Sequence, residues 1–175
     1  RVLRPGGRIL PARFRLFVEP VTLHDEMRIR RFPNIALPDG IDLSTMAQSP
    51  VAARFDTGRN DQFWLRLHSV ASTIGDPEPV LEFDLTTLAS ADELPTRHRI
   101  ERTAATDTIV DGCCIWFDAV FDDDTLLSTS PLEPMTSWGN RVFRLDDEVA
   151  AGETLHIDID LGILVEPSTW QVRVR

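Results

Sequence analysis

The 175-residue chain contains no lysine and no tyrosine, and all 18 of its basic residues are arginine. Asp and Glu together number 28, so the formal net charge is −10 at pH 7. Nucleic acids are held largely by basic side chains on phosphates, so this balance argues against nucleic acid as the main partner. An acidic surface instead attracts cationic peptides and raises their rate of encounter.

Long apolar runs are also missing. The longest candidate, residues 109–121, is interrupted by Asp111 and Asp118 and is shorter than the roughly 20 residues that a membrane helix needs. The sequence shows no signal peptide, because no basic segment is followed by an apolar run. The two cysteines, Cys113 and Cys114, are adjacent and point to opposite faces of a strand, so no disulfide is expected between them. We therefore expect a cytoplasmic protein without a membrane partner.

Motifs for common catalytic chemistry and cofactors are absent. The sequence has no G-x-S-x-G nucleophile elbow, no G-x-G-x-x-G, no Walker A segment and no H-E-x-x-H. Its hydrophobic fraction of 42% and charged fraction of 26% are typical of a globular domain, and its length suits one domain. Motifs and composition alone therefore indicate a β domain that binds or supports other molecules.

Short apolar stretches separated by turn residues predict β-strands. The clearest stretch is 154–161, where four aliphatic residues alternate with His156, Asp158 and Asp160. Further strands are expected at residues 12–18, around 64–70, at 80–85, at 109–121 with a bend at Gly112, at 142–145 and at 169–174. The predicted fold class is mainly β, an antiparallel β-barrel or barrel-like sandwich.

The region from about residue 24 to 58 lacks this strand pattern. It carries several arginines and prolines, and Asp42 suits the cap of a short helix that continues to Met46. A long irregular stretch inside a compact domain usually has a binding or functional role. We therefore expect this region to protrude from the β domain.

Several groups of polar residues suggest chemistry, but each has a simpler explanation. His156, Asp158 and Asp160 share one strand face and could ligate a metal, although the solvated face of a half-buried strand explains the same spacing. The run 122–124 of three aspartates fits a solvated hairpin tip better than a calcium loop.

The remaining candidates are also interpreted as structural. The run 24–26 is interpreted as a solvated turn, and His68 and His98 as ordinary histidines. Cys113 and Cys114 are interpreted as buried, inert thiols, because apolar residues follow them and no basic residue lies beside them. No metal site is predicted in the chain.

The segment 127–140 joins two predicted strands and is the strongest candidate for a site. Pro131 and Pro134 stiffen it, and Trp138 is a large aromatic residue in a polar loop. Such a loop on a rigid β scaffold can form the wall of a binding site. The alternative is a proline-stiffened connection whose Trp138 covers the core, and the residues alone leave both open.

This segment resembles the C-terminal β-barrel of the protein arginine N-methyltransferases. In that family a strand leads to a Ser-Thr-x-Pro-like run, a Thr-His-Trp loop and a strand of the Val-Phe-x-Leu type. The matching residues here are 127–131, 136–138 and 141–145, followed by a glycine turn and strand at 151–155. Residues 3–13 resemble the junction with the family's upstream methyltransferase domain, which implies a cis Leu10–Pro11 bond.

The resemblance implies a division of the chain and of the work. Residues 1–11 would be the end of the upstream domain and the junction, and 12–175 the β-barrel, with a partly helical dimerisation arm inserted at about 24–58. Thr136, Ser137 and Trp138 would bind an Arg-rich protein or peptide substrate. The dimerisation residues, from the match to the arm tip and its continuation, would be Gly40, Ile41, Asp42, Leu43 and Met46.

The resemblance also implies what the segment lacks. The pocket for S-adenosylmethionine and the two glutamates that grip the substrate guanidinium lie on the family's upstream domain. The chain is therefore expected to be the substrate-binding and dimerisation barrel of an S-adenosylmethionine-dependent methyltransferase. The resemblance also implies that this enzyme is a homodimer. The chain would have no catalytic residue of its own and would be inactive in isolation.

One position departs from the family pattern. The family loop usually has histidine where this chain has Ser137, and serine cannot carry a positive charge. The degree of methylation is therefore left open. Two alternatives also stay open: a methyltransferase barrel with a non-arginine substrate, and a stand-alone β-sandwich that binds carbohydrate or protein through Trp64, Trp116 or Trp170. If Trp138 belongs to a site, it is expected at the edge of the domain.

Overall fold

The structure, a computed structural model, describes residues 7, 9–28, 62–65, 69–134 and 136–175. Ten strands and three short 3-10 helices occur in these residues. The strands are β1 (Arg13–Leu23), β2 (Gln62–Leu65), β3 (Val70–Thr73), β4 (Leu81–Asp84), β5 (Arg97–Thr103), β6 (Thr108–Val120), β7 (Leu126–Ser128), β8 (Asn140–Val149), β9 (Thr154–Asp160) and β10 (Gln171–Val174). The 3-10 helices are η1 (Asp25–Met27), η3 (Ala91–Glu93) and η4 (Pro167–Thr169).

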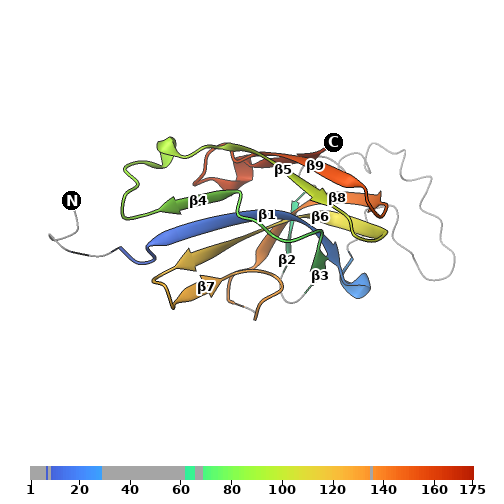
Figure 1. Cartoon of the computed structure of the whole chain (residues 1–175), viewed down its shortest axis with the longest axis horizontal. Helices are drawn as coiled ribbons and strands as arrows, with labels where there is room; N and C mark the ends of the chain where they lie inside the picture. The colour runs from blue at the N-terminus through green and yellow to red at the C-terminus, as the bar shows by residue number, and fades with distance from the viewer. Residues whose placement is uncertain (1–6, 8, 29–61, 66–68, 135) are drawn as a thin grey trace, which may run out of the picture.

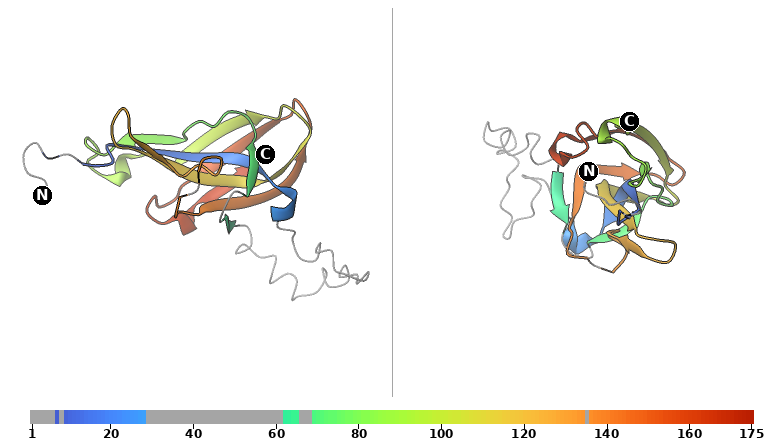
Figure 2. Two further views of the ribbon diagram at one scale, coloured as in Figure 1. Left: turned by 90° about the horizontal axis from the view of Figure 1, so that it is seen from below. Right: turned by 90° about the vertical axis from the view of Figure 1, so that its left-hand side faces the viewer.

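The strands form two antiparallel sheets (Figure 1). The larger sheet has the order β2-β8-β6-β1-β3, with β4 paired to the first part of β1 and β7 to the end of β6. The smaller sheet has the order β10-β9-β5. The end-on view in Figure 2 shows the strands curving around a common interior. The predicted antiparallel, barrel-like sandwich is confirmed, and the described strands form two ladders and not one closed barrel.

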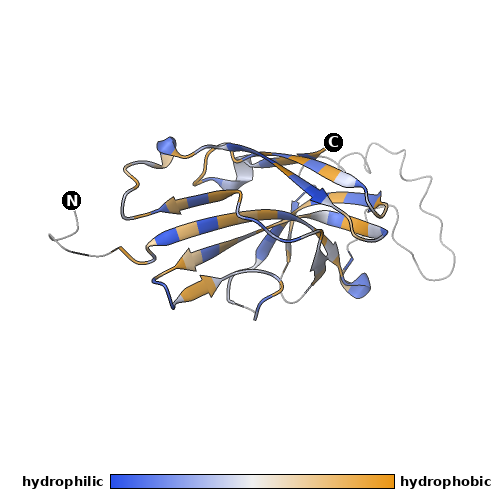
Figure 3. Cartoon of the chain, in the orientation of Figure 1, coloured by the Kyte–Doolittle hydropathy of each residue, from blue (hydrophilic) through white to orange (hydrophobic). Residues whose placement is uncertain are grey.

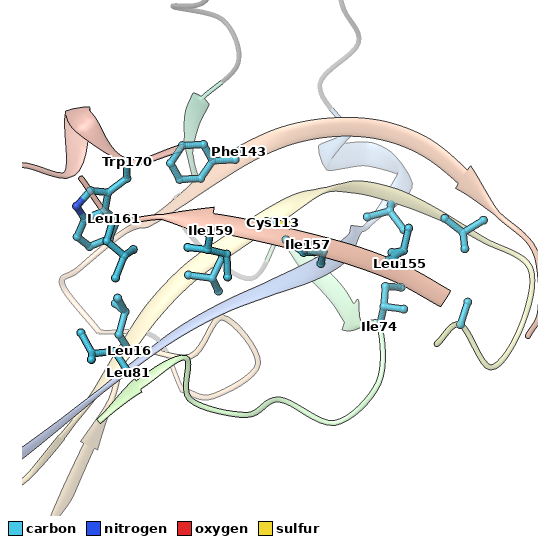
Figure 4. Close-up of a cluster of buried hydrophobic side chains, with 14 residues drawn as sticks. Leu16, Ile74, Leu81, Cys113, Phe143, Leu155, Ile157, Ile159, Leu161 and Trp170 are labelled. Carbon is cyan, nitrogen blue, oxygen red and sulfur yellow. The ribbon is translucent and has the colours of Figure 1, made fainter. Parts of the chain in front are cut away.

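The main core lies between the two sheets (Figure 4). β9 contributes Leu155, Ile157 and Ile159, and Leu161 follows directly, as the alternating sequence predicts. Their neighbours His156, Asp158 and Asp160 lie on the opposite face, so this strand changes from apolar to polar at each residue (Figure 3). The predicted half-buried strand is therefore confirmed.

A second core cluster lies on the other face of the larger sheet. Phe17 of β1 stacks on Trp116 of β6 with 5.3 Å between ring centroids, and Cys114 packs in the same cluster. Cys113 points into the main core instead, so the adjacent cysteines do face opposite sides of the sheet. β6 is thus buried on both faces, which explains the near-continuous apolar run at 109–121.

A buried ion pair joins the two sheets. Glu19 on β1 has no exposed surface, and Arg102 on β5 is 9% exposed. Arg102 Nε donates a 2.7 Å hydrogen bond to Glu19 Oε2, and Arg102 Nη2 donates to Glu19 Oε1. The Glu78 amide adds a 2.9 Å bond to Oε1. The hydrogen bonds that Arg102 donates to the Glu19 carboxylate raise the pKa of Arg102, so this contact between the sheets stays charged.

A second buried carboxylate fixes the chain that follows β1. Asp111 of β6 is 3% exposed and accepts a 2.7 Å hydrogen bond from the Leu23 amide. Arg28 Nε donates a 2.7 Å bond to its other oxygen. Asp111, the first of the two aspartates that interrupt the apolar run at 109–121, is therefore paired with a cation, which offsets the cost of burying its charge.

Gly112 marks an irregularity in the ladder between β6 and β8. The register shifts between Val110 and Gly112, at the residue where the sequence predicts a bend. A Cβ on Gly112 would overlap the carbonyl oxygen of Phe143, so only glycine lets the two backbones approach this closely.

Some strand predictions need correction. The single strand expected around 64–70 is two strands, β2 and β3, which pair with different partners. The sequence does not predict β5, because most of its residues are charged or polar. The one buried position of this strand is occupied by Arg102 and not by an apolar residue. β7 is only three residues long and was also missed.

Several predictions fall outside the described residues. These include the proposed dimerisation residues Gly40, Ile41, Asp42, Leu43 and Met46 and most of the proposed arm at 24–58. The Leu10–Pro11 bond is cis, as the family resemblance implies. In the part of the chain that is described, no helix has the length and apolar character needed to cross a bilayer.

We expect the ion pair between the sheets to be worth several times an exposed one. Glu19→Gln leaves the buried Arg102 charge with only the exposed Glu78, 4.0 Å from Nη1, as a counter-charge, and should lower the free energy of unfolding by about 3 kcal/mol. The matched control, Arg99→Gln, removes a pair whose arginine side chain is 63% exposed, and should cost less than about 1 kcal/mol. Urea denaturation measures both, and equal losses would contradict the assignment.

The two thiols should be inert in the native protein. Cys113 and Cys114 have no exposed surface, and burial raises the pKa of both thiols. A thiol-specific aromatic disulfide at pH 8 should therefore label neither within minutes in native buffer and both in denaturant. Rapid labelling of the native chain would show that one thiol lies at an accessible surface.

Candidate functional site

An open apolar cavity of about 610 Å³ lies where β1 enters the fold, and we call it the mouth. It includes side chains from β1, β4 and β6 together with those of the loops before β5, before β8 and before β10. Figure 2 shows this end of the fold facing the viewer in its right-hand view. The lining is mainly apolar and includes Phe14, Leu81, Phe83, Ile115, Phe117 and Trp170.

A series of aromatic contacts connects the interior of the mouth with its rim. Phe14 stacks on Phe117 with ring centroids 5.0 Å apart and contacts Phe83 at 5.4 Å. Phe117 meets Trp138 edge to face at 5.9 Å. Such contacts position an aromatic ring more rigidly than a single hydrophobic contact would. Trp138 is thereby held at the rim while 54% of it remains exposed.

The loop between β7 and β8 is tied to β6 at both ends. Thr129 exchanges hydrogen bonds with the backbone of Phe117 through its own amide and its hydroxyl, all at 2.9 Å. Asn140 Nδ2 donates to the Thr129 carbonyl at 2.8 Å and to the Ile115 carbonyl at 3.4 Å. A Cβ on Gly139 would lie 2.8 Å from the Leu65 carbonyl oxygen, so this residue must be small where the loop meets β2.

The three residues taken from the Thr-x-Trp pattern have different positions. Ser137 and Trp138 line the mouth, and Thr136 shapes the turn beneath them. The Trp138 amide donates to Thr136 Oγ1 at 3.3 Å, a local bond typical of threonine in turns. Trp138 is at the edge of the domain, as expected of a site residue, and it also contacts the core residue Phe117. Its part in substrate binding stays a prediction.

Arg141 is a rim residue that the sequence analysis did not single out. Its guanidinium carbon lies 5.1 Å from the centroid of the Trp64 ring, and Trp64 is 60% exposed. Its Nη1 is buried and donates no hydrogen bond to any acceptor in the part of the chain described. The pairing of Trp64 with Arg141 depends on the register of β2 on β8, which neither strand's sequence reveals.

The chemistry of the lining is that of a binding surface. Among the described residues that line the mouth, Arg141 is the only charged one, and Ser137 and Thr129 contribute hydroxyls. These groups can bury apolar or aromatic surface and can hold a carboxylate at Arg141. The lining residues offer no carboxylate, imidazole or thiol for proton transfer or nucleophilic attack.

The polar face of β9 is a set of ion pairs across strands. Asp158 accepts from Arg99 Nε at 2.8 Å and pairs with Arg175 at 2.7 Å, and these arginines lower the pKa of Asp158. His156 Nδ1 lies 3.1 Å from Glu101 Oε1, and Asp160 pairs with Arg97 at 3.3 Å. The solvated face of a half-buried strand is therefore the correct interpretation of this triplet.

The other candidate groups also have structural positions. Asp122 accepts a bond from the Asp124 amide at the exposed turn between β6 and β7, which confirms the predicted hairpin tip. His24 is exposed before η1, and His98 Nε2 contacts the Pro95 carbonyl at 3.0 Å. His68 lies outside the described residues. Across the described ranges, no group of three or more His, Cys, Asp or Glu is placed to hold a metal.

The three tryptophans named for an aromatic binding face all contribute to the lining of the mouth, but two of them are almost fully buried. Trp116 is 4% exposed and Trp170 is 8% exposed, whereas Trp64 lies at the rim of the mouth. Two of the three therefore serve the core.

Comparison with known proteins gives consistent results. Residues 13–173 match the family model described as the arginine methyltransferase oligomerization subdomain. The chain is 25% identical over 164 residues to protein arginine N-methyltransferase 6 of Xenopus tropicalis, covering 92% of this chain and 47% of that protein. It is 28% identical over 156 residues to the arginine N(omega)-methyltransferase of Streptomyces achromogenes subsp. streptozoticus, covering 88% of this chain and 40% of that protein.

A solved structure shares the fold. The PRMT1 enzyme-prozyme heterotetrameric complex of Trypanosoma brucei with AdoHcy matches with a TM-score of 0.61 at 18% identity, over 91% of this chain and 49% of that chain. This chain thus spans about half the length of the curated relatives it matches. With the family model matched from β1 to β10, the chain belongs to the arginine methyltransferase oligomerization subdomain family.

Proposed function

We propose that this chain is the substrate-binding and dimerisation region of an S-adenosylmethionine-dependent protein arginine methyltransferase, and that methyl transfer also requires an upstream catalytic domain. The observation that carries the proposal is the open mouth, rimmed by Trp138 and Ser137, in a chain that matches an oligomerization subdomain. Two named relatives are arginine methyltransferases about twice as long as this chain.

The chemistry of the mouth supports this division of labour. Methyl transfer is a displacement at a sulfonium methyl group, and an enzyme promotes it mainly by positioning and electrostatics. A substrate guanidinium needs carboxylates, which the described lining of the mouth does not provide. Those carboxylates, and the binding of S-adenosylmethionine, are therefore assigned to the upstream domain. Ser137 and Trp138 form one wall of the cleft between the two domains, with Thr136 supporting them.

The guanidinium of Arg141, whose Nη1 has no hydrogen-bond partner among the described residues, has a part in this arrangement. Ser137 stands where the family usually has histidine, so the rim lacks the charge that an imidazolium would carry. Arg141 lines the same cavity and presents a buried Nη1 without a hydrogen-bond partner among the described residues. In the proposed enzyme Arg141 pairs with a carboxylate of the catalytic domain and aligns the two halves.

Dimerisation is proposed on the family match. Oligomerization is the function in the family's description, and a homodimer is the simplest closed assembly of one chain. Gly40, Ile41, Asp42, Leu43 and Met46 remain the proposed contact residues.

A second candidate acceptor is arginine itself. The Streptomyces relative is named for arginine and not for protein arginine, and its 28% identity is higher than that of the Xenopus relative. A small acceptor would not need a peptide cleft. Mass spectrometry of the products formed from free arginine, from an arginine peptide and from other small amines would distinguish these substrates, including a non-arginine one.

The first test joins the chain to its upstream sequence. We expect the longer protein to transfer a methyl group from S-adenosylmethionine to an arginine-rich peptide, because both halves of the cleft are then present. The present chain alone should show no transfer above background. Product mass measures both. Transfer by the chain alone, or a coding sequence without an upstream methyltransferase domain, would contradict the proposal.

The second test concerns the rim. In the joined protein, Trp138→Ala and Arg141→Gln should each lower kcat/KM by about tenfold, because each removes a group that orients the cleft. Leu132→Ala is the matched control, since this residue is 49% exposed on the same loop and does not line the mouth. Losses equal to that of the control would show that the rim has no part in catalysis.

A further inference from the structure

We propose that Asp118 forms a docking pocket for the guanidinium of an arginine that flanks the methylated residue in the substrate. This inference rests on the proposed function, because it names the kind of peptide that the enzyme takes. The pocket is a separate depression of about 480 Å³, bordered by the first part of the loop that carries Ser137 and Trp138.

Asp118 differs from the other buried carboxylates. Glu19, Asp111 and Asp118 are 0%, 3% and 9% exposed, respectively. Glu19 is paired with Arg102, and Asp111 with Arg28. Asp118 has no hydrogen bond or ion pair in the part of the chain described, and its Oδ1 is buried without a partner. A buried charge without a partner is costly, so this carboxylate is suited to a cation that arrives from outside.

The cation opposite Asp118 in the ladder pairs with another carboxylate. Arg15 of β1 lies directly opposite Asp118 of β6 in the ladder. Its Nε forms an ion pair with Glu82 at 3.2 Å. Arg15 therefore neutralises the carboxylate beside it on β4 and leaves Asp118 facing the pocket.

The rest of the pocket suits a planar organic cation. Glu133 adds a second carboxylate at the rim, and Ser128 and Ser130 add hydroxyls. Each hydroxyl oxygen accepts one hydrogen bond from a backbone amide. A serine oxygen has a second lone pair, which can accept from a donor such as a guanidinium N–H. Trp116 forms part of the wall. Guanidinium combines several donors in a plane with favourable aromatic contacts, whereas ammonium is a compact, strongly hydrated charge.

The pocket and the mouth are neighbours. Trp116 is part of the lining of both, and one loop borders the pocket through Ser130, Glu133 and Pro134 and the mouth through residues 137–139. A peptide that crosses this loop can therefore place one arginine in the cleft beside Trp138 and another at Asp118. The pocket selects peptides that carry more than one arginine, and a single free arginine gains nothing from it.

The binding test uses the present chain and three peptides of equal length, with three arginines, three lysines or one arginine. Calorimetry should show the three-arginine peptide binding most tightly. Asp118→Asn should weaken its binding about tenfold, as expected for a charge-assisted contact in a partly buried site. Asp123→Asn is the matched control, because it removes the same charge from the exposed hairpin tip, and it should change the affinity less than twofold.

Folding is controlled separately. Glu133 is exposed at the pocket rim, so Glu133→Gln does not disturb the core, and it should weaken binding of the three-arginine peptide about threefold. Equal effects of the Asp118 and Asp123 variants would show general charge attraction and overturn the proposal. Equal binding of the lysine and arginine peptides would overturn the guanidinium assignment.

Activity separates this proposal from the proposed function. In the joined protein, Asp118→Asn should raise KM for the three-arginine peptide about tenfold while leaving its kcat and the KM for the one-arginine peptide unchanged. A wild-type protein without methyl transfer that still binds the three-arginine peptide through Asp118 would sink the proposed function alone. Active wild-type protein with unchanged KM values in the variant would sink the docking pocket alone.

Discussion

The buried contact between Glu19 and Arg102 is the constraint on which the arrangement of the two sheets depends. The described strands form two separate hydrogen-bonded ladders, so side chains must fix one sheet on the other. Apolar contacts between sheets tolerate sliding, because they have little directional preference. A carboxylate that accepts two guanidinium bonds and one amide bond allows a single alignment. That alignment sets where the loops before β5 and β10 of the smaller sheet lie relative to β1, β4 and β6 of the larger sheet, and therefore where the mouth opens.

The sequence predicts the strands whose side chains alternate and fails where charge occupies a core position. The β9 pattern follows from period-two burial, and β6 reads as a continuous run because both of its faces are covered. β5 contains the residue that locks the sheets together, yet its charged sequence gives no strand signal. A buried arginine looks like a surface residue until its carboxylate partner, 83 positions away, is placed beside it.

The candidate site was partly predictable for a similar reason. The loop with Ser137 and Trp138 carries a local pattern, so the sequence could indicate it and the structure places both residues at one cavity. Arg141 and Asp118 carry no such pattern. Arg141 matters because it lies over Trp64, which depends on the register of β2 on β8. Asp118 matters because its Oδ1 has no partner in the described chain, which depends on what the register of β1 on β6 places beside it. Non-local pairing is information that a single sequence does not contain.

The distribution of paired charges shows which surfaces are prepared for other molecules. Arginines and acids of the small sheet neutralise one another, and the two deepest carboxylates each have an arginine. Five side-chain atoms are buried without a hydrogen-bond partner among the described residues, and two of them are Arg141 Nη1 at the mouth and Asp118 Oδ1 at the neighbouring pocket. Each of these two groups lies at a cavity and has the charge that attracts its proposed partner. Arg141 would attract a carboxylate of the catalytic half, and Asp118 would attract a substrate guanidinium. A substrate that meets both the cleft and the pocket must cross the loop between them, which makes that loop the element that relates substrate choice to the assembly of the cleft.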